Sequence, residues 1–169
     1  MNPAPYAVRE TALPNDEATS RLGAALASVL PIKLHIHLHG DLGAGKTSLV
    51  RGMLRALGHV GSVKSPTYAL VESYTLTRIS HTSSKTSNLY FQHFDFYRFN
   101  RDADWLDAGF RDVLASDAIC AIEWPEQAGD LLPPPDLDVR LTYAEPGRHA
   151  LIEAWTPLGA DCLARLVMT

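Results

Sequence analysis

The sequence predicts an α/β fold with three layers, in which a mixed, mostly parallel sheet is flanked by helices and ends in antiparallel C-terminal strands. Helix and strand patterns alternate along most of the chain, a glycine-rich segment joins a strand pattern to a helix pattern, and two β-rich runs meet at a short turn near the C-terminus. The 169 residues are 46% hydrophobic and show no internal repeat. One domain spanning residues 1–169, with one buried core, is therefore expected.

The first elements are predicted by the spacing of apolar residues. Helical spacing predicts a helix over Asp16–Val29, and its first residue is an acid, which a helix N-terminus favours. Alternating apolar residues predict a strand over Ile32–His39. A second helical stripe follows residues 40–47 and extends to Gly58, where a glycine in the left-handed conformation can end the helix.

The rest of the chain contains more strand patterns than helix patterns. Strands are predicted over Tyr68–Leu76, Asn88–Phe99, Ala118–Glu123, Leu137–Tyr143 and Arg148–Trp155, and helices over Ala103–Ala115 and Pro157–Val167. The Ser/Thr-rich stretch Thr77–Ser87 has no apolar face, so we expect it to be a flexible surface insertion between two strands.

Charge, cysteine content and hydropathy exclude several classes of protein. The net charge of −4 lacks the basic excess that tight, direct binding to a nucleic-acid backbone needs. The two cysteines, Cys120 and Cys162, have no metal-ligand or redox spacing. No stretch approaches the roughly 20 apolar residues of a membrane span. We therefore expect a cytoplasmic protein that does not enter a membrane and reaches any nucleic acid through a partner.

Residues 40–47, Gly-Asp-Leu-Gly-Ala-Gly-Lys-Thr, fit the pattern G-x-x-x-x-G-K-[ST] of a phosphate-binding P-loop. A chance match is expected in about one chain of this size in a hundred or fewer, given the average usage of glycine. A strand precedes the segment and a helix follows it, so the fold is predicted to be P-loop NTPase-like. The predicted nucleotide-binding residues of this segment are Gly40, Asp41, Leu42, Gly43, Ala44, Gly45, Lys46, Thr47 and Ser48. Lys46 is expected to reach the β- and γ-phosphates, and the Thr47 hydroxyl to bind Mg²⁺.

Two acids in apolar strand patterns, Asp95 and Glu123, are candidates for holding Mg²⁺ or orienting an attacking water. Charged residues are seldom buried without a partner, and a metal site would supply one. The alternative for each acid is a strand-edge carboxylate that points to solvent. Thr67, in Ser65-Pro66-Thr67, could contact the γ-phosphate or Mg²⁺, or it could simply begin a strand after a loop.

His35, His37 and His39 share one face of the predicted strand and could bind a transition metal. No fourth ligand is evident nearby in the sequence. A packed or solvated strand face is the simpler interpretation of this pattern.

Four motifs occur in a characteristic order: residues 40–47, Val63-Lys-Ser-Pro-Thr-Tyr68, His93-Phe-Asp-Phe-Tyr-Arg98 and Ile122-Glu-Trp-Pro125. Together they resemble the motif set of the TsaE family, from about Leu13 to about Arg148. The resemblance implies a Mg²⁺-dependent ATPase that is required to form threonylcarbamoyl-adenosine in tRNA. It also implies that the protein acts together with the TsaD and TsaB proteins and reaches tRNA only through the complex with them.

The resemblance also implies roles for individual residues. Lys46, Asp95 and Glu123 would form the catalytic set, with Asp95 supporting hydrolysis, and Thr47 and Glu123 would be the Mg²⁺ ligands. Thr67 matches a switch-like threonine. Further contacts to ATP are expected from Asp16, or its neighbour Glu17, at the start of the first helix, from Trp124 beside the metal-binding acid, and from Arg148 near the base. Residues 77–87 depart from the family, because they lengthen the connection between two strands by something like ten residues on loop-length expectations.

Two other functions share the same residues. A P-loop kinase would transfer the γ-phosphate to a small metabolite, although no arginine-rich lid is apparent. A nucleotide-dependent switch module would bind nucleotide to shape a docking surface, with negligible turnover. We expect the isolated chain to hydrolyse ATP slowly, because the sequence offers no obvious arginine finger apart from Arg98 near Asp95.

Overall fold

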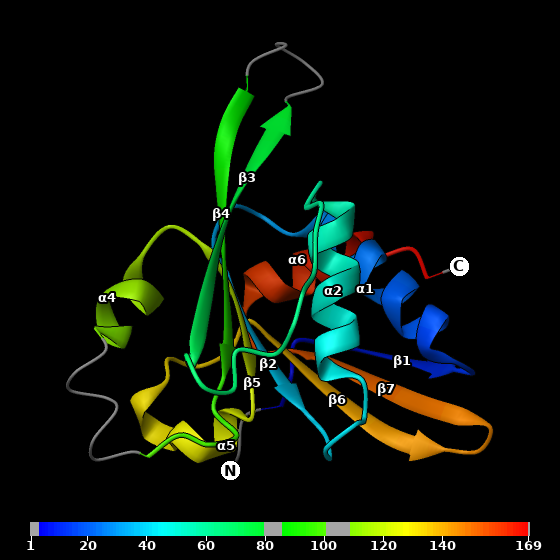
Figure 1. The fold of residues 1–169 in the computed structure, drawn as a ribbon. Helices are drawn as coiled ribbons and strands as arrows, with labels where there is room; N and C mark the ends of the chain where they lie inside the picture. The colour runs from blue at the N-terminus through cyan, green and yellow to red at the C-terminus, as the bar shows by residue number, and fades with distance from the viewer. Residues whose placement is uncertain (1–3, 80–85, 101–108, 169) are drawn as a thin grey trace.

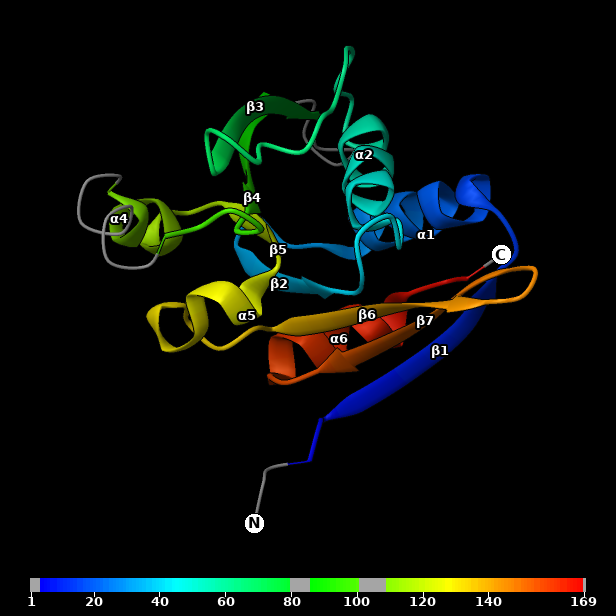
Figure 2. The same ribbon diagram turned by 60° about the horizontal axis from the view of Figure 1, so that its bottom comes forward.

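A computed structural model describes residues 4–79, 86–100 and 109–168, and its strands lie in one twisted sheet (Figures 1 and 2). The strands are β1 (Ala7–Leu13), β2 (Leu34–His39), β3 (Val71–Ile79), β4 (Thr86–Asp95), β5 (Ile119–Glu123), β6 (Leu137–Ala144) and β7 (Gly147–Ala154). The helices are α1 (Asp16–Val29), α2 (Lys46–Ala56), α4 (Phe110–Ala115), α5 (Pro125–Ala128) and α6 (Pro157–Arg165), with a 3₁₀ turn at Gly129–Leu131. In this part of the chain no helix has the length and apolar character needed to cross a membrane.

The sheet is parallel in its centre and antiparallel at both edges. The strand order is β1-β7-β6-β2-β5-β4-β3, and β6, β2, β5 and β4 run parallel to one another. At the edges, β3 pairs antiparallel with β4, and β7 pairs antiparallel with both β6 and β1. The predicted mixed sheet with antiparallel C-terminal strands is confirmed. Because parallel strands end at the same edge, the carboxyl ends of β2, β4 and β5 come together.

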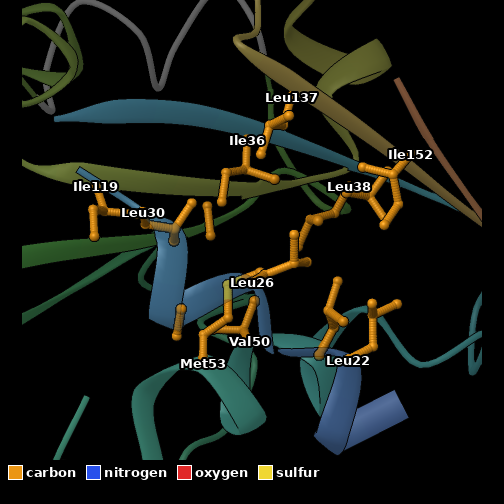
Figure 3. Packing of buried hydrophobic residues seen from close by; sticks show 14 of the residues in the cluster. Leu22, Leu26, Leu30, Ile36, Leu38, Val50, Met53, Ile119, Leu137 and Ile152 are labelled. Atoms are coloured by element: carbon orange, nitrogen blue, oxygen red, sulfur yellow. The ribbon is translucent and has the colours of Figure 1, made fainter. Parts of the chain in front are cut away.

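The larger part of the core lies between the sheet and helices α1 and α2 (Figure 3). Leu34, Ile36 and Leu38 of β2 are buried on this face, as their alternation in sequence predicts. The two helices approach each other closely at glycines. A Cβ atom at Gly52 would lie 2.2 Å from the Ser20 carbonyl oxygen, so only glycine fits there without a shift of the backbone. This packing fixes α2, and hence the glycine-rich loop before it, against the sheet.

A smaller cluster covers the opposite face of the sheet. Cys120 and Ile122 of β5 pack there with Phe94, Phe96 and Phe110, next to α4 and α5. Ile119 and Ala121, their neighbours in the sequence, belong instead to the larger cluster. Helices therefore lie on both faces of the sheet, and the predicted three-layer arrangement is confirmed.

Several elements differ from the sequence prediction. Strand β1 was not predicted, since Arg9 and Glu10 interrupt the apolar alternation; it is a mostly exposed edge strand held by pairing with β7. Helix α5, which begins at Pro125, was also not predicted. Of the helix predicted over Ala103–Ala115, Phe110–Ala115 is observed, and residues 103–108 lie outside the described residues.

The boundaries of β3 and β4 also differ from those predicted. The strands pair through Thr77↔Asn88 and as far as Ile79↔Thr86, so both ends of the predicted 77–87 insertion belong to the sheet. Residues 80–85 of that insertion lie outside the described residues. Strand β3 begins at Val71 because the preceding Leu70 has a positive φ of 64°, which interrupts extended backbone.

Candidate nucleotide and metal site

The glycine-rich segment forms a tight loop between the end of β2 and the start of α2. Gly40, Gly43 and Gly45 have φ values of 139°, 79° and 109°, a region that strongly favours glycine. A Cβ atom at Gly40 would also lie 2.5 Å from the Leu141 carbonyl oxygen. Helix α2 begins at Lys46 without a side-chain cap, so its first N–H groups have no side-chain acceptor. Such a helix N-terminus attracts an anion.

Lys46 is the cation of this loop, and its side chain is held in place by the backbone. The residue is only 4% exposed, and its Nζ donates hydrogen bonds to the carbonyl oxygens of Gly40 and Asp41. The ammonium also lies 4.0 Å from the ring centroid of Trp124. Burial lowers the pKa of Lys46, while nearby carboxylates, Glu123 first, act in the opposite direction. The carbonyl oxygens and the aromatic ring that contact the Lys46 ammonium carry only partial negative charge. A bound phosphate would therefore neutralise the positive charge of Lys46 more fully.

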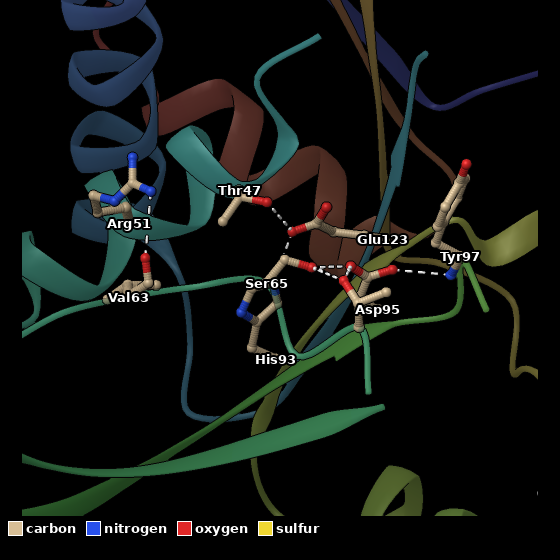
Figure 4. Close-up of polar contacts among 9 residues, drawn as sticks. Thr47, Arg51, Val63, Ser65, His93, Asp95, Tyr97 and Glu123 are labelled. Carbon is tan, nitrogen blue, oxygen red and sulfur yellow. Dashed lines mark hydrogen bonds and ion pairs between the residues drawn. The ribbon is translucent and has the colours of Figure 1, made fainter. Parts of the chain in front are cut away.

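Thr47 and Glu123 place two oxygen atoms at a distance suited to a shared Mg²⁺ ion. The Thr47 hydroxyl donates to Glu123 Oε1 at 2.8 Å (Figure 4). Two adjacent ligands of an octahedral Mg²⁺ lie about 2.9 Å apart, given metal–oxygen distances of about 2.0–2.1 Å. Glu123 is 3% exposed, and the same Oε1 accepts a hydrogen bond from Nε2 of the buried His93 at 2.8 Å. The residues present therefore fit the ion, and His93 orients the carboxylate.

Asp95 is the second acid of the site and is 3% exposed. It lies opposite Glu123 in the β4–β5 register. Its Oδ2 accepts hydrogen bonds from the hydroxyls of Ser65 and Thr67, and its Oδ1 accepts one from the Tyr97 N–H at 2.9 Å. Burial raises the pKa of Asp95, while the bond from Tyr97 opposes that change. The result is a buried carboxylate that is tied to the 65–67 segment (Figure 4).

These groups surround one pocket of about 240 Å³. Its lining includes most of the residues predicted from the sequence: Leu42, Gly43, Gly45, Lys46, Thr47, Ser48, Thr67, Asp95, Glu123, Trp124 and Arg148. Arg148 donates a hydrogen bond to the Gly43 carbonyl oxygen at 3.2 Å, which ties the loop to β7. The nucleotide, metal and catalytic roles of these residues stay predictions.

Five residues singled out from the sequence do not line the pocket. The carbonyls of Gly40 and Asp41 hold Lys46, which lines the pocket, and the side chain of Ala44 in the same loop is fully buried. Asp16 lies in the first turn of α1, beyond the lining residues. Arg98, the candidate arginine finger, has its guanidinium 5.1 Å from the ring centroid of Tyr68 and also does not line the pocket.

Sequence reasoning missed three residues of the site: Ser65, His93 and Tyr97. His93 and Asp95 are two apart on β4, so they point to the same face of the sheet. The two-residue spacing between His93 and the proposed catalytic acid Asp95 could therefore have identified His93 as a residue of the site. Tyr97 packs on Trp124 with ring centroids 5.0 Å apart, and Trp124 itself has a positive φ of 57°. Nothing local in the sequence predicts the Tyr97–Trp124 ring contact or the positive φ of Trp124.

Comparison with known proteins identifies the family. A family model for "Threonylcarbamoyl adenosine biosynthesis protein TsaE" matches residues 13–150. A tRNA threonylcarbamoyladenosine biosynthesis protein TsaE from Haemophilus influenzae is 38% identical over 158 residues, which cover 90% of this chain and 93% of that protein. A protein of the same name from Synechocystis is 37% identical over 122 residues, covering 70% of this chain and 71% of that protein.

The fold also has a counterpart among solved structures. The crystal structure of Bacillus subtilis YdiB superposes with a TM-score of 0.72 at 21% sequence identity, and the match covers 95% of this chain and 93% of that chain. At this identity the similarity concerns the fold alone. The matches in sequence carry the assignment: the chain belongs to the TsaE family of tRNA threonylcarbamoyladenosine biosynthesis proteins.

Proposed function

We propose that this chain is a Mg²⁺-dependent ATPase that acts in the cytoplasm with TsaD and TsaB to support turnover during formation of threonylcarbamoyl-adenosine in tRNA. The observation that carries the proposal is the convergence of Lys46, the Thr47–Glu123 pair and Asp95 on one pocket. A phosphate-binding cation, an oxygen pair for a metal and a further acid are the groups that phosphoryl transfer to water requires.

Lys46 and the loop would bind the phosphates. The Lys46 ammonium is already confined to the loop by two carbonyls, so little side-chain entropy is lost when it binds an anion. The uncapped N-terminus of α2 adds N–H donors and the positive end of the helix dipole. Arg148, which is hydrogen-bonded to Gly43, adds a second cation at the rim.

Thr47 and Glu123 would hold Mg²⁺, which supplies charge neutralisation for the phosphate oxygens when it is bound. His93 keeps the Glu123 carboxylate facing Thr47, since its Nε2 and the Thr47 hydroxyl share one oxygen of that carboxylate. We therefore assign His93 as a positioning residue for the metal ligand, in the manner of an outer-shell hydrogen bond.

Asp95 would orient the attacking water and accept its proton. The raised pKa of this buried acid makes its carboxylate a stronger base than an exposed aspartate. Ser65 and Thr67 are hydrogen-bonded to the same carboxylate, so the position of the 65–67 segment is linked to the acid. Arg51 steadies this segment from α2 by donating to the Val63 carbonyl oxygen at 3.3 Å (Figure 4).

Hydrolysis by the isolated chain should be slow. Arg148 is the only arginine among the described lining residues, and it is already hydrogen-bonded to the loop backbone. A cation that stabilises the transition state accelerates related reactions by about 10³–10⁵. A partner that supplies such a group, or that orders the 65–67 segment, would therefore raise the rate.

The test is ATP hydrolysis by the purified chain with Mg²⁺, alone and with TsaB and TsaD, using Glu123→Ala as the control. Stimulation by the two partners that disappears in the variant would support the proposal. Absence of stimulation, with partner binding intact, would favour the switch module. Transfer of the γ-phosphate to a small-molecule acceptor in place of water would favour the kinase.

A further inference from the structure

The histidine-rich face of β2 lies on the side of the sheet opposite to α1 and α2. Leu34, Ile36 and Leu38 belong to the core cluster under those helices, so the alternate residues point the other way. His35 leaves the group, since its Nε2 contacts the Leu114 carbonyl oxygen at 2.9 Å. His37 and His39 remain beside β6.

Strand β6 supplies a third ligand that is distant in sequence. Asp138 lies directly opposite His37 in the parallel β2–β6 register. One ligand atom from each of His37, His39 and Asp138 can be chosen so that all lie within 4.8 Å of one another. Ligand atoms around a tetrahedral Zn²⁺ lie about 3.3–3.5 Å apart, given Zn–N and Zn–O distances of about 2.0–2.2 Å. The two ligand atoms that lie farthest apart would need to approach each other by roughly 1.5 Å, a movement that rotation of the side chains can supply.

Two buried polar atoms of this cluster have no hydrogen-bond partner in the described part of the chain: His37 Nε2 and Asp138 Oδ1. His37 is 8% exposed. A buried polar atom without a hydrogen-bond partner destabilises the folded state, and such atoms are rare in native proteins.

Both ring nitrogens of His39 face carboxylates. Nε2 lies 2.8 Å from Asp138 Oδ2, and Nδ1 lies 3.2 Å from Glu126 Oε2. A neutral imidazole has a single N–H and cannot donate to both. If a metal ion were bound at Nε2, the single N–H at Nδ1 could donate to Glu126.

We infer that His37, His39 and Asp138 form a binding site for a divalent transition-metal ion such as Zn²⁺, with Glu126 orienting His39. Two imidazoles and a carboxylate suit Zn²⁺, whereas Mg²⁺ prefers oxygen ligands. A ligating histidine usually donates its second N–H to a carboxylate, which is the position of Glu126 relative to His39.

The site is separate from the Thr47–Glu123 pair, because β2 presents His37 and His39 on the other face of the sheet. His39 and Glu126 line an open groove together with Arg140, which gives the ion access from solvent. The sequence alone favoured a packed or solvated strand face for these histidines. The third ligand could not be seen there, because Asp138 lies 99 residues after His39 in the chain.

The experiment is titration of the tag-free, full-length chain with Zn²⁺ by calorimetry, and with Co²⁺ by visible absorption, in excess Mg²⁺. We expect one equivalent to bind, with the absorption of a nitrogen- and oxygen-ligated ion. His37→Gln and Asp138→Asn should each weaken binding by more than about 100-fold, and Glu126→Gln by about tenfold, as outer-shell changes do. His35→Gln is the matched control and should retain the affinity of the parent chain.

Circular dichroism and urea unfolding in EDTA will show whether each variant folds. If His37→Gln does not fold, Asp138→Asn decides the question. Failure of the parent chain to bind Zn²⁺ or Co²⁺ would overturn the inference. Undiminished binding by the folded Asp138→Asn variant would also overturn it, because the ion would then lie elsewhere. Neither result depends on ATP hydrolysis, so the proposed ATPase function is tested separately.

Discussion

Replacing His93 by leucine should weaken Mg²⁺ binding while leaving the fold intact. The imidazole Nε2 donates to Glu123 Oε1 at 2.8 Å, and the His93 side chain is fully buried. The contact requires the tautomer with the proton on Nε2, since a carboxylate oxygen only accepts. Leucine fills similar space but cannot donate. The carboxylate would then keep the Thr47 hydroxyl as its donor and lose the group that fixes its rotamer.

The size of the effect follows from the charge of the acceptor. A hydrogen bond to a charged group is worth about 1.5–3 kcal/mol, and each 1.4 kcal/mol is about tenfold in an equilibrium constant. His93→Leu should therefore raise the Mg²⁺ concentration for half-maximal nucleotide binding by about 10- to 100-fold, in line with other outer-shell changes. It should also lower the free energy of unfolding in EDTA by about 1–3 kcal/mol, since a buried carboxylate loses a donor.

The assay is binding of a fluorescent ATP analogue across a Mg²⁺ titration, combined with urea unfolding. His93→Gln should restore much of the Mg²⁺ affinity, because its amide can donate from nearly the same position as Nε2. His149→Leu is a matched control at a partly exposed histidine, whose Nε2 lies 3.6 Å from Glu10. An unchanged Mg²⁺ dependence in His93→Leu, with the fold intact, would refute the positioning role of this residue.

Three further predictions concern packing, titration and fluorescence. Gly52→Ala should destabilise the chain by roughly 1–3 kcal/mol or more in urea unfolding, because the added Cβ would lie 2.2 Å from the Ser20 carbonyl oxygen; unchanged stability would contradict the close helix contact. Burial raises the pKa of Cys120 from 9.0 to about 12, so its thiol should resist iodoacetamide at pH 8 until the chain unfolds. Between about pH 9 and pH 12 the unfolded thiol loses its proton while the folded one keeps it, so stability should fall with rising pH, and less steeply in Cys120→Ala. Nucleotide binding should change the fluorescence of Trp124, since the ring lies 4.0 Å from the Lys46 ammonium; a full response in Trp124→Phe would show that the signal comes from another tryptophan.

Features that depend on near neighbours in the chain could be predicted from the sequence. The loop of residues 40–47 is one contiguous segment, so its glycines, Lys46 and Thr47 could be identified without knowledge of the fold. Apolar periodicity predicted α1, α2 and α6, and it also predicted most of the strands, because the repeat of each element is local. Asp95 and Glu123 stood out as acids in apolar strands, and the structure places both at the same pocket.

Pairings between distant segments required the tertiary structure. Strand β1 is a strand because β7 supplies its hydrogen bonds, and its own residues carry little apolar alternation. The register of β4 and β5 decides that His93 reaches Glu123, across 30 residues of sequence. Similarly, the β2–β6 register sets Asp138 opposite His37.

Periodicity therefore showed which face of a strand a side chain occupies, but not which strand lies beside it. Neighbours in a sheet are chosen by packing and hydrogen bonding summed over the whole sheet, and these terms link residues far apart in the chain. For this reason the sequence by itself determined the phosphate-binding loop and the two acids. Only the tertiary structure decided which histidine orients Glu123 and which acid completes the histidine cluster on the opposite face.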